Sequence, residues 1–188
     1  MKKSLGARTL AFPTPVWLVG TFDAEGKPNV MTAAWAGICC SQPPCVAVSL
    51  RKATYTYGSL MLKRAFTISI PPADRVKEAD YCGIASGKAG NKFAAAGLTP
   101  VKGDLVDAPY VQEFPLVLEC KLFHTLEIGL HTLFVGEILD VKAEGSVLGE
   151  KGLPDIEKVK PIVFGPEIRT YHGIGAYLGK PFSIGKEL

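Results

Sequence analysis

The segments LVLECKLFHTLEI at residues 116–128 and HTLFVGEILDVKAE at 131–144 form the strongest strand pair in this sequence. Both are rich in Val, Ile, Leu, Thr and Phe, residue types that favour β-strands. Only Gly129 and Leu130 join them, and so short a connection places two strands side by side as an antiparallel hairpin. The hairpin predicts a protein built mainly from antiparallel β-structure.

Four further strands are predicted before this hairpin. VWLVGTF at 16–22 and NVMTAAWA at 29–36 flank the turn residues DAEGKP and form a second hairpin. CVAVSL at 45–50 has the density of valine expected of a strand buried on both faces. AFTISI at 65–70 ends at a pair of prolines, which cannot continue a strand ladder.

Two short helices interrupt the strands. Residues 54–63 have apolar positions at helical spacing, with Thr54 as the N-cap, and residues 73–86 have a second helical pattern. The Gly- and Lys-rich stretch 87–104, with a brief helical turn, and the stretch 145–158 are expected to be surface loops.

The chain after residue 158 contains three short predicted strands, which are VKPIVFG, IRTYHGI and PFSI. The predicted order along the chain is strands, then helices in the connections, then strands again. This order is typical of an antiparallel barrel and not of a parallel βαβ sheet. A mainly β fold with short helices, forming one domain over residues 1–188, is therefore expected.

Composition excludes several classes of protein. Hydrophobic residues make up 47% of the chain and charged residues 21%, which excludes a disordered protein. The 20 glycines and 14 prolines are too many for a helical bundle. The net charge of +3 comes from dispersed residues, so nucleic acid is not the expected partner.

Targeting and metal-binding patterns are absent from the sequence. No apolar stretch reaches the roughly 18 residues of a membrane helix, and prolines interrupt the N-terminal segment, so a cytoplasmic protein without membrane contact is expected. The five cysteines include no C-x-x-C pair, and the three histidines are not spaced four apart on a helix. We therefore expect neither a disulfide framework nor a metal site.

Two phosphate-binding motifs nearly occur, and both fail on spacing. GIASGKA at 83–89 has one residue too few for a P-loop and no hydroxyl after its lysine. GIGAYLG at 173–179 misses the dinucleotide fingerprint by one residue, and too little sequence follows it for a βαβ unit.

A polar cluster at the end of one strand and the start of the first helix is the best anion site in the sequence. It brings together two cations and three hydroxyls, which are Ser49, Arg51, Lys52, Thr54 and Thr56. A helix N-terminus favours an anion such as phosphate. The alternative is a solvated turn with an ordinary N-cap.

For each of the other candidate site residues, an ordinary structural role is the alternative to ligand binding. Ser86 to Lys92 is a second polar cluster, or an ordinary helix end and loop. Trp35 follows the small residues of its strand and packs either against a flat ring or in the core. His131 is a ligand contact or a structural histidine, and Cys39 and Cys40 are expected to pack as small apolar residues.

Taken together, these segments resemble the flavin reductase-like family of FMN-binding split barrels. The resemblance rests on the order of the segments and covers residues 13–166. Its motifs are PTPVWLVGT, GKPNVMTAAW, PPCVAVSLRK, TYTY, AFTISIP, SGKAGNKF, LECK and HTLFVGEI.

The resemblance implies an antiparallel split β-barrel that forms a homodimer and binds one FMN per subunit near the interface. It implies that Asn29, Thr32, Ala33, Ala34 and Trp35 line the isoalloxazine ring, and that Ser49, Arg51, Thr54 and Thr56 contact the phosphate and ribityl chain. Lys92 would add a cation, and His131 and Phe164 would lie beside the flavin, one of them from the partner subunit. The remaining residues assigned to the cofactor site are Cys39, Leu50, Ser86 and Phe93.

Three functions follow as hypotheses. The first is a flavin-dependent oxidoreductase that takes hydride from NADH or NADPH. The second is an FMN electron carrier that is reduced by a redox partner protein and has no NAD(P)H activity. The third is a split barrel that binds another small ligand without redox chemistry. In the flavin hypotheses the cofactor carries the chemistry, which explains why the sequence contains no catalytic triad or carboxylate pair.

Overall fold

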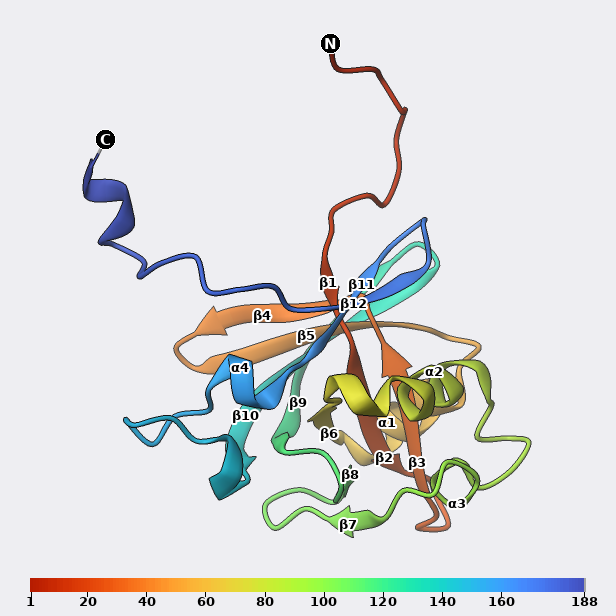
Figure 1. The fold of residues 1–188 in the computed structure, drawn as a ribbon. Coiled ribbons are helices and arrows are strands. Elements are labelled where there is room, and N and C mark those ends of the chain that lie inside the picture. The colour runs from red at the N-terminus through yellow and green to blue at the C-terminus, as the bar shows by residue number, and fades with distance from the viewer. Residues whose placement is uncertain (188) are drawn as a thin grey trace.

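A computed structural model describes residues 1–187 and shows a mainly β protein with short helices (Figure 1). Seven strands form one antiparallel sheet in the order β3-β2-β6-β9-β10-β5-β4. Their bounds are β2 Trp17–Phe22, β3 Pro28–Ala33, β4 Ala36–Ser41, β5 Pro44–Arg51, β6 Ala65–Ile70, β9 Leu116–Ile128 and β10 His131–Ala143. The predicted fold class is confirmed.

The connection between β3 and β4 shows that this sheet curls on itself. The two strands lie at opposite edges of the sheet, yet only Ala34 and Trp35 join them. A chain extends at most about 3.6 Å per residue, so the two edges must approach each other. The backbone N–H of Ser49 in β5 donates a 2.8 Å hydrogen bond to the Trp35 carbonyl and fixes this junction.

The long hairpin predicted from the sequence is formed by β9 and β10. Their register is irregular between Val135 and Gly136 and again between Ile138 and Asp140, as expected of β-bulges. A Cβ atom on Gly136 would lie 2.4 Å from the ring of Phe66. The bend therefore depends on a glycine that lets β6 pack closely against the hairpin.

The predicted helices form at their expected places. They are α1 at Tyr55–Lys63 and α2 at Val76–Ile84, the latter preceded by the 3-10 turn η1 at Ala73–Arg75. Short turns of helix follow at α3 Lys92–Ala95 and α4 Ile156–Val159. Thr54 is the N-cap residue of α1, but its hydroxyl donates to the Arg51 carbonyl and does not cap the helix.

Two small sheets complete the fold. One contains β1 (Thr14–Pro15), β11 (Ile162–Gly165) and β12 (Thr170–Gly173) in the order β1-β11-β12, and the other pairs β7 (Pro100–Lys102) with β8 (Pro109–Val111). Further 3-10 turns are η2 at Gly145–Val147 and η3 at Ile184–Glu187.

Several predicted details are wrong. The strand expected at 29–36 ends at Ala33, because the chain crosses from one sheet edge to the other there. The strand expected at 181–184 is a turn leading into η3, since Pro181 lacks an N–H and Phe182 adopts a left-handed φ of 57°. Cys39 and Cys40 are exposed and do not pack in the core, because they lie on edge strand β4.

Apolar side chains pack in two main clusters. The first fills the barrel and includes Val19, Val46, Phe66 and Phe134. The second lies between β2, β3 and α2 and includes Phe93, so the stretch 87–104 is not wholly at the surface. Within residues 1–187, no helix combines the length and apolar character needed to cross a bilayer.

Candidate functional site

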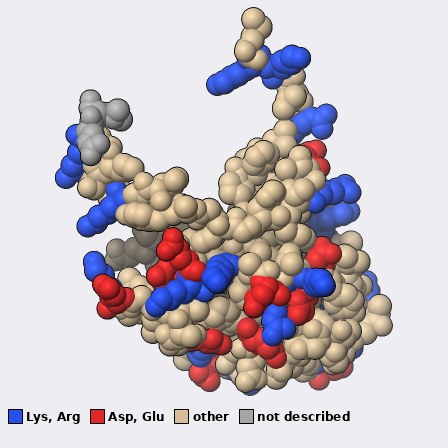
Figure 2. Space-filling model, in the orientation of Figure 1, with Lys and Arg blue, Asp and Glu red and all other residues tan. Residues whose placement is uncertain are grey.

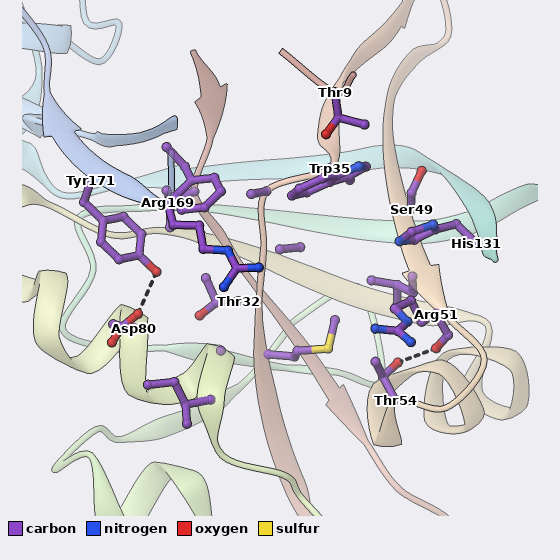
Figure 3. A pocket seen from close by; sticks show the side chains of 18 of the residues that line it. Thr9, Thr32, Trp35, Ser49, Arg51, Thr54, Asp80, His131, Arg169 and Tyr171 are labelled. Carbon is purple, nitrogen blue, oxygen red and sulfur yellow. Dashed lines mark hydrogen bonds between the residues drawn. The ribbon is translucent and has the colours of Figure 1, made fainter. Parts of the chain in front are cut away.

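A pocket of about 730 Å³ opens where β3 crosses to β4 (Figure 3). Its walls come from β3, the end of β5, the start of β10, α2, and the turn between β11 and β12. The lining residues are Thr9, Val16, Met31, Thr32, Ala33, Ala34, Trp35, Ser49, Leu50, Arg51, Thr54, Asp80, Gly83, Ile84, Leu130, His131, Phe164, Glu167, Arg169 and Tyr171.

One wall of the pocket is made of small side chains followed by an indole. Ala33 and Ala34 line the pocket with small side chains, and the Thr32 hydroxyl donates a hydrogen bond to the Ala79 carbonyl in α2. Trp35 is 42% exposed, so the alternative that it packs in the core is wrong. The β3–β4 crossing holds it at the pocket wall, where its ring offers an apolar surface to a flat ligand.

A cationic end of the pocket forms where β5 meets α1. Arg51 ends β5 and is paired in register with His131 at the start of β10. The Thr54 hydroxyl and backbone N–H both donate to the Arg51 carbonyl, at 2.8 and 3.0 Å. Arg51 forms no ion pair with any residue that the structure describes. With the N-terminus of α1 beside it, this end is suited to an anion.

The opposite end of the pocket is closed by a bond between β12 and α2. The Tyr171 hydroxyl donates to the Asp80 carboxylate at 2.9 Å (Figure 3). Burial, together with this bond to Asp80, raises the pKa of Tyr171 to about 12. The ring of Phe164 lies 5.5 Å from that of Tyr171, centre to centre, so β11 and β12 present a joint aromatic surface.

Most of the pocket lies in the part of the chain that matches a known family, although Glu167, Arg169 and Tyr171 lie beyond it. Residues 8–164 match the family described as flavin reductase like domain. This chain belongs to the flavin reductase-like family.

Individual relatives agree with this assignment. Flavoredoxin of Desulfovibrio vulgaris (Miyazaki F) is 61% identical, with a TM-score of 0.95 over 99% of this chain and 100% of that one. Flavoredoxin from Methanosarcina acetivorans is 32% identical, with a TM-score of 0.93 over 100% and 98% of the two chains. The NADH:riboflavin 5'-phosphate oxidoreductase of Streptomyces pristinaespiralis is 27% identical over 69% of this chain and 70% of its own length. The family predicted from the sequence, the flavin reductase-like split barrels, is therefore confirmed.

In this family member, the structure brings ten of the sixteen predicted site residues to the pocket wall. They are Thr32, Ala33, Ala34, Trp35, Ser49, Leu50, Arg51, Thr54, His131 and Phe164. They come from four separate segments of the chain, which only the fold assembles.

The other six predicted residues lie away from the pocket wall. Lys92 is buried, and its Nζ donates a 2.9 Å hydrogen bond to the Cys82 carbonyl between α3 and α2. Phe93 packs in the second apolar cluster, Ser86 is exposed on the loop after α2, and Cys39 is exposed on β4. The last two are Asn29 and Thr56.

Asn29 and Thr56 form a buried polar pair between β3 and α1. The Asn29 Nδ2 group donates to the Thr56 hydroxyl at 2.9 Å, while Asn29 Oδ1 has no hydrogen-bond partner in the described part of the chain. A Cβ atom on Gly87 would lie 2.5 Å from that oxygen, so the backbone of the loop after α2 passes close beside it. A buried acceptor without a donor favours a ligand that supplies one.

Sequence reasoning missed five polar residues of the pocket, which are Thr9, Asp80, Glu167, Arg169 and Tyr171. Three of them come after Phe164, the last residue that the resemblance assigned to the site. The alternation of β12 could have suggested Tyr171, but nothing in the sequence relates it to Asp80. Among the described residues, no three His, Cys, Asp or Glu side chains gather as metal ligands would.

Proposed function

We propose that this protein binds FMN in the pocket and uses it to accept electrons from a donor and pass them to an acceptor. The observation that carries the proposal is one pocket with two parts: the small-residue wall ending at Trp35, and the cationic end at Arg51 and Thr54. The first suits a planar ring, and the second suits a phosphate dianion.

The residues present fit this cofactor. Arg51 and the first N–H groups of α1 would hold the phosphate, and Ser49 would add a hydroxyl donor. Asn29 Oδ1 is a buried acceptor without a donor, two residues before the pocket wall on the same strand.

When bound, FMN supplies the redox chemistry, because its ring accepts and returns electrons. The chain's own residues bind and orient the ring. Trp35 would cover it, backbone N–H groups of Ala33 and Ala34 would donate to its polar edge, and Phe164 and Tyr171 would shield it from water.

The electron donor divides the proposal into two forms. The name of the Streptomyces relative favours NADH as a donor, and the flavoredoxin relatives favour transfer between proteins. We propose the NAD(P)H-dependent oxidoreductase as the first form and the electron carrier as the second.

The test begins with the purified protein. We expect it to be yellow, or to become yellow and retain the colour after addition of FMN and gel filtration. A protein that stays colourless contradicts both forms. Anaerobic bleaching of the bound flavin by NADH or NADPH supports the first form, and bleaching only after a redox partner protein is supplied supports the second.

We further propose that the protein works as a homodimer in the cytoplasm. Both terminal arms extend away from the barrel (Figure 1), and the C-terminal arm exposes Tyr177 and Leu178 at 72% and 87%. Charged side chains gather on the lower part of the face in Figure 2, whereas the surface between the arms is largely uncharged. A second copy of the chain would cover these apolar side chains. A monomeric mass by light scattering at micromolar concentration would contradict the dimer.

A further inference from the structure

Arg169 is a cation of the pocket that is held in place by a tight turn between β11 and β12. Its backbone is left-handed, with φ 54°, and its N–H donates a 2.9 Å hydrogen bond to the Gly165 carbonyl. Glu167 in the same turn accepts hydrogen bonds from the Thr9 N–H and hydroxyl and pairs with Arg8. The turn is therefore tied to the N-terminal arm, which limits how far Arg169 can move.

The side chain of Arg169 points into the pocket toward the β3 wall at Thr32 (Figure 3). In residues 1–187 it forms no ion pair. The two acidic residues of the pocket are engaged elsewhere, since Asp80 accepts from Tyr171 and Glu167 binds the N-terminal arm. The guanidinium charge is thus free to act on a ligand.

The pocket has two arginines at different positions. A single phosphate group can bind beside only one of these arginines. Arg51 has the N-terminus of α1 beside it, and a cation next to a helix N-terminus is what a phosphate needs. Arg169 comes from the β12 side of the pocket, next to Tyr171 and across from Thr32. It therefore faces the part of the pocket where the ring would lie.

A positive charge at that place favours the reduced ring. Hydride delivers two electrons and one proton from the donor to the neutral ring, and this leaves the ring with one negative charge. An arginine stays protonated at all working pH values, and its attraction for such a charge is stronger where a bound ring excludes water than in open solvent. The neutral oxidised ring gains much less from the same arginine.

We propose that Arg169 stabilises the reduced form of the bound flavin and so raises its midpoint potential. This role rests on the proposed FMN function and assigns Arg169 to tuning the cofactor, not to holding its phosphate.

The experiment compares Arg169→Gln and Arg169→Lys with the wild-type protein, all loaded with FMN. The midpoint potential is measured by anaerobic equilibration with a reference dye, and the dissociation constants of FMN and riboflavin are measured by fluorescence titration. Arg64→Gln is the matched control, because Arg64 is also an exposed arginine with a left-handed φ of 52° and lies outside the pocket.

We expect Arg169→Gln to lower the ratio of reduced to oxidised flavin about tenfold at a fixed potential, which corresponds to about 30 mV for two electrons. Arg169→Lys should retain most of the wild-type potential, and Arg64→Gln should retain all of it. Affinity for oxidised FMN should change little in any variant.

Two results would overturn this role while leaving the proposed function intact. One is an unchanged potential in Arg169→Gln. The other is a loss of FMN affinity without a loss of riboflavin affinity, which would place the phosphate at Arg169. A wild-type protein that binds no FMN would instead overturn the proposed function and this role with it.

Discussion

The Nζ group of Lys92 donates a 2.9 Å hydrogen bond to the backbone carbonyl of Cys82, and this bond joins α3 to the end of α2. Lys92 is only 4% exposed. Burial lowers the pKa of Lys92, and burial raises the pKa of the Cys82 thiol to about 11. A residue predicted to add a cation to the phosphate site thus connects two helices in the structure.

Replacing Lys92 tests this connection. In Lys92→Met the apolar stem remains, but the Cys82 carbonyl loses its donor, so we expect the free energy of unfolding to fall by about 1–3 kcal/mol. Urea denaturation of the flavin-free protein measures the change. Lys88→Met is the control, because Lys88 is exposed and its side chain makes no hydrogen bond within residues 1–187. Equal stability of the two variants would contradict a structural role for Lys92.

The bond from Tyr171 to Asp80 predicts a pH-dependent stability. Because the pKa of Tyr171 is raised to about 12, its contribution is complete below the ordinary tyrosine pKa of about 10 and is lost as the pH rises through about 12. The difference in phenolate absorbance between the wild type and Tyr171→Phe during an alkaline titration isolates this residue. Asp80→Asn should lower the pKa of Tyr171 only in part, since burial remains. Titration of Tyr171 near 10 in the wild type would contradict the structure.

Glu119 on β9 should give the stability of the protein the opposite dependence on pH. It is fully buried, and its carboxylate accepts hydrogen bonds from the Lys142 ammonium and from the backbone N–H groups of Asp104 and Leu105. Burial alone would raise the pKa of Glu119, but these hydrogen bonds outweigh it and lower the pKa below the usual value. The stabilisation is therefore present above about pH 4.5 and is lost as the pH falls through the lowered pKa.

Glu119→Gln measures that contribution. At neutral pH we expect its free energy of unfolding to be lower than that of the wild type by about 1.5–3 kcal/mol, the range for hydrogen bonds to a charged group. Denaturation curves at several pH values should show this difference shrinking below about pH 4. A difference that does not depend on pH would contradict a charged Glu119.

Replacing Gly136 should cause a steric clash at the bulge of the long hairpin. In Gly136→Ala the new methyl group would meet the Phe66 ring at 2.4 Å, and overpacking of this kind costs about 1–3 kcal/mol of stability. Gly58→Ala is the matched control, because a Cβ there meets nothing within 4 Å. Since Gly58 lies inside α1, this variant should be about 0.5–1 kcal/mol more stable than the wild type. Thermal unfolding that shifts both variants in the same direction would contradict the packing at Gly136.

The sequence determined the local structure of this protein well. The content of strand-favouring residues and the short connection between them located the long hairpin, the helical spacing located α1 and α2, and the order of short motifs identified the family. The sequence also located two parts of the pocket, which are the small residues before Trp35 and the polar cluster around Arg51. These features depend on neighbouring residues along the chain, and local patterns report such neighbours directly.

Only the tertiary structure decided how those parts meet and what completes them. Tyr171 and Asp80 are separated by 91 positions in the sequence, and no local pattern relates them. Lys92 turned inward to Cys82, and Arg169 was carried to the pocket by a turn tied to the N-terminal arm. The exposure of Trp35 likewise followed from the crossing of β3 to β4 at the opposite sheet edge. Strand periodicity shows which residues share one face of a strand. The segments that this face packs against are set by how the whole sheet curls.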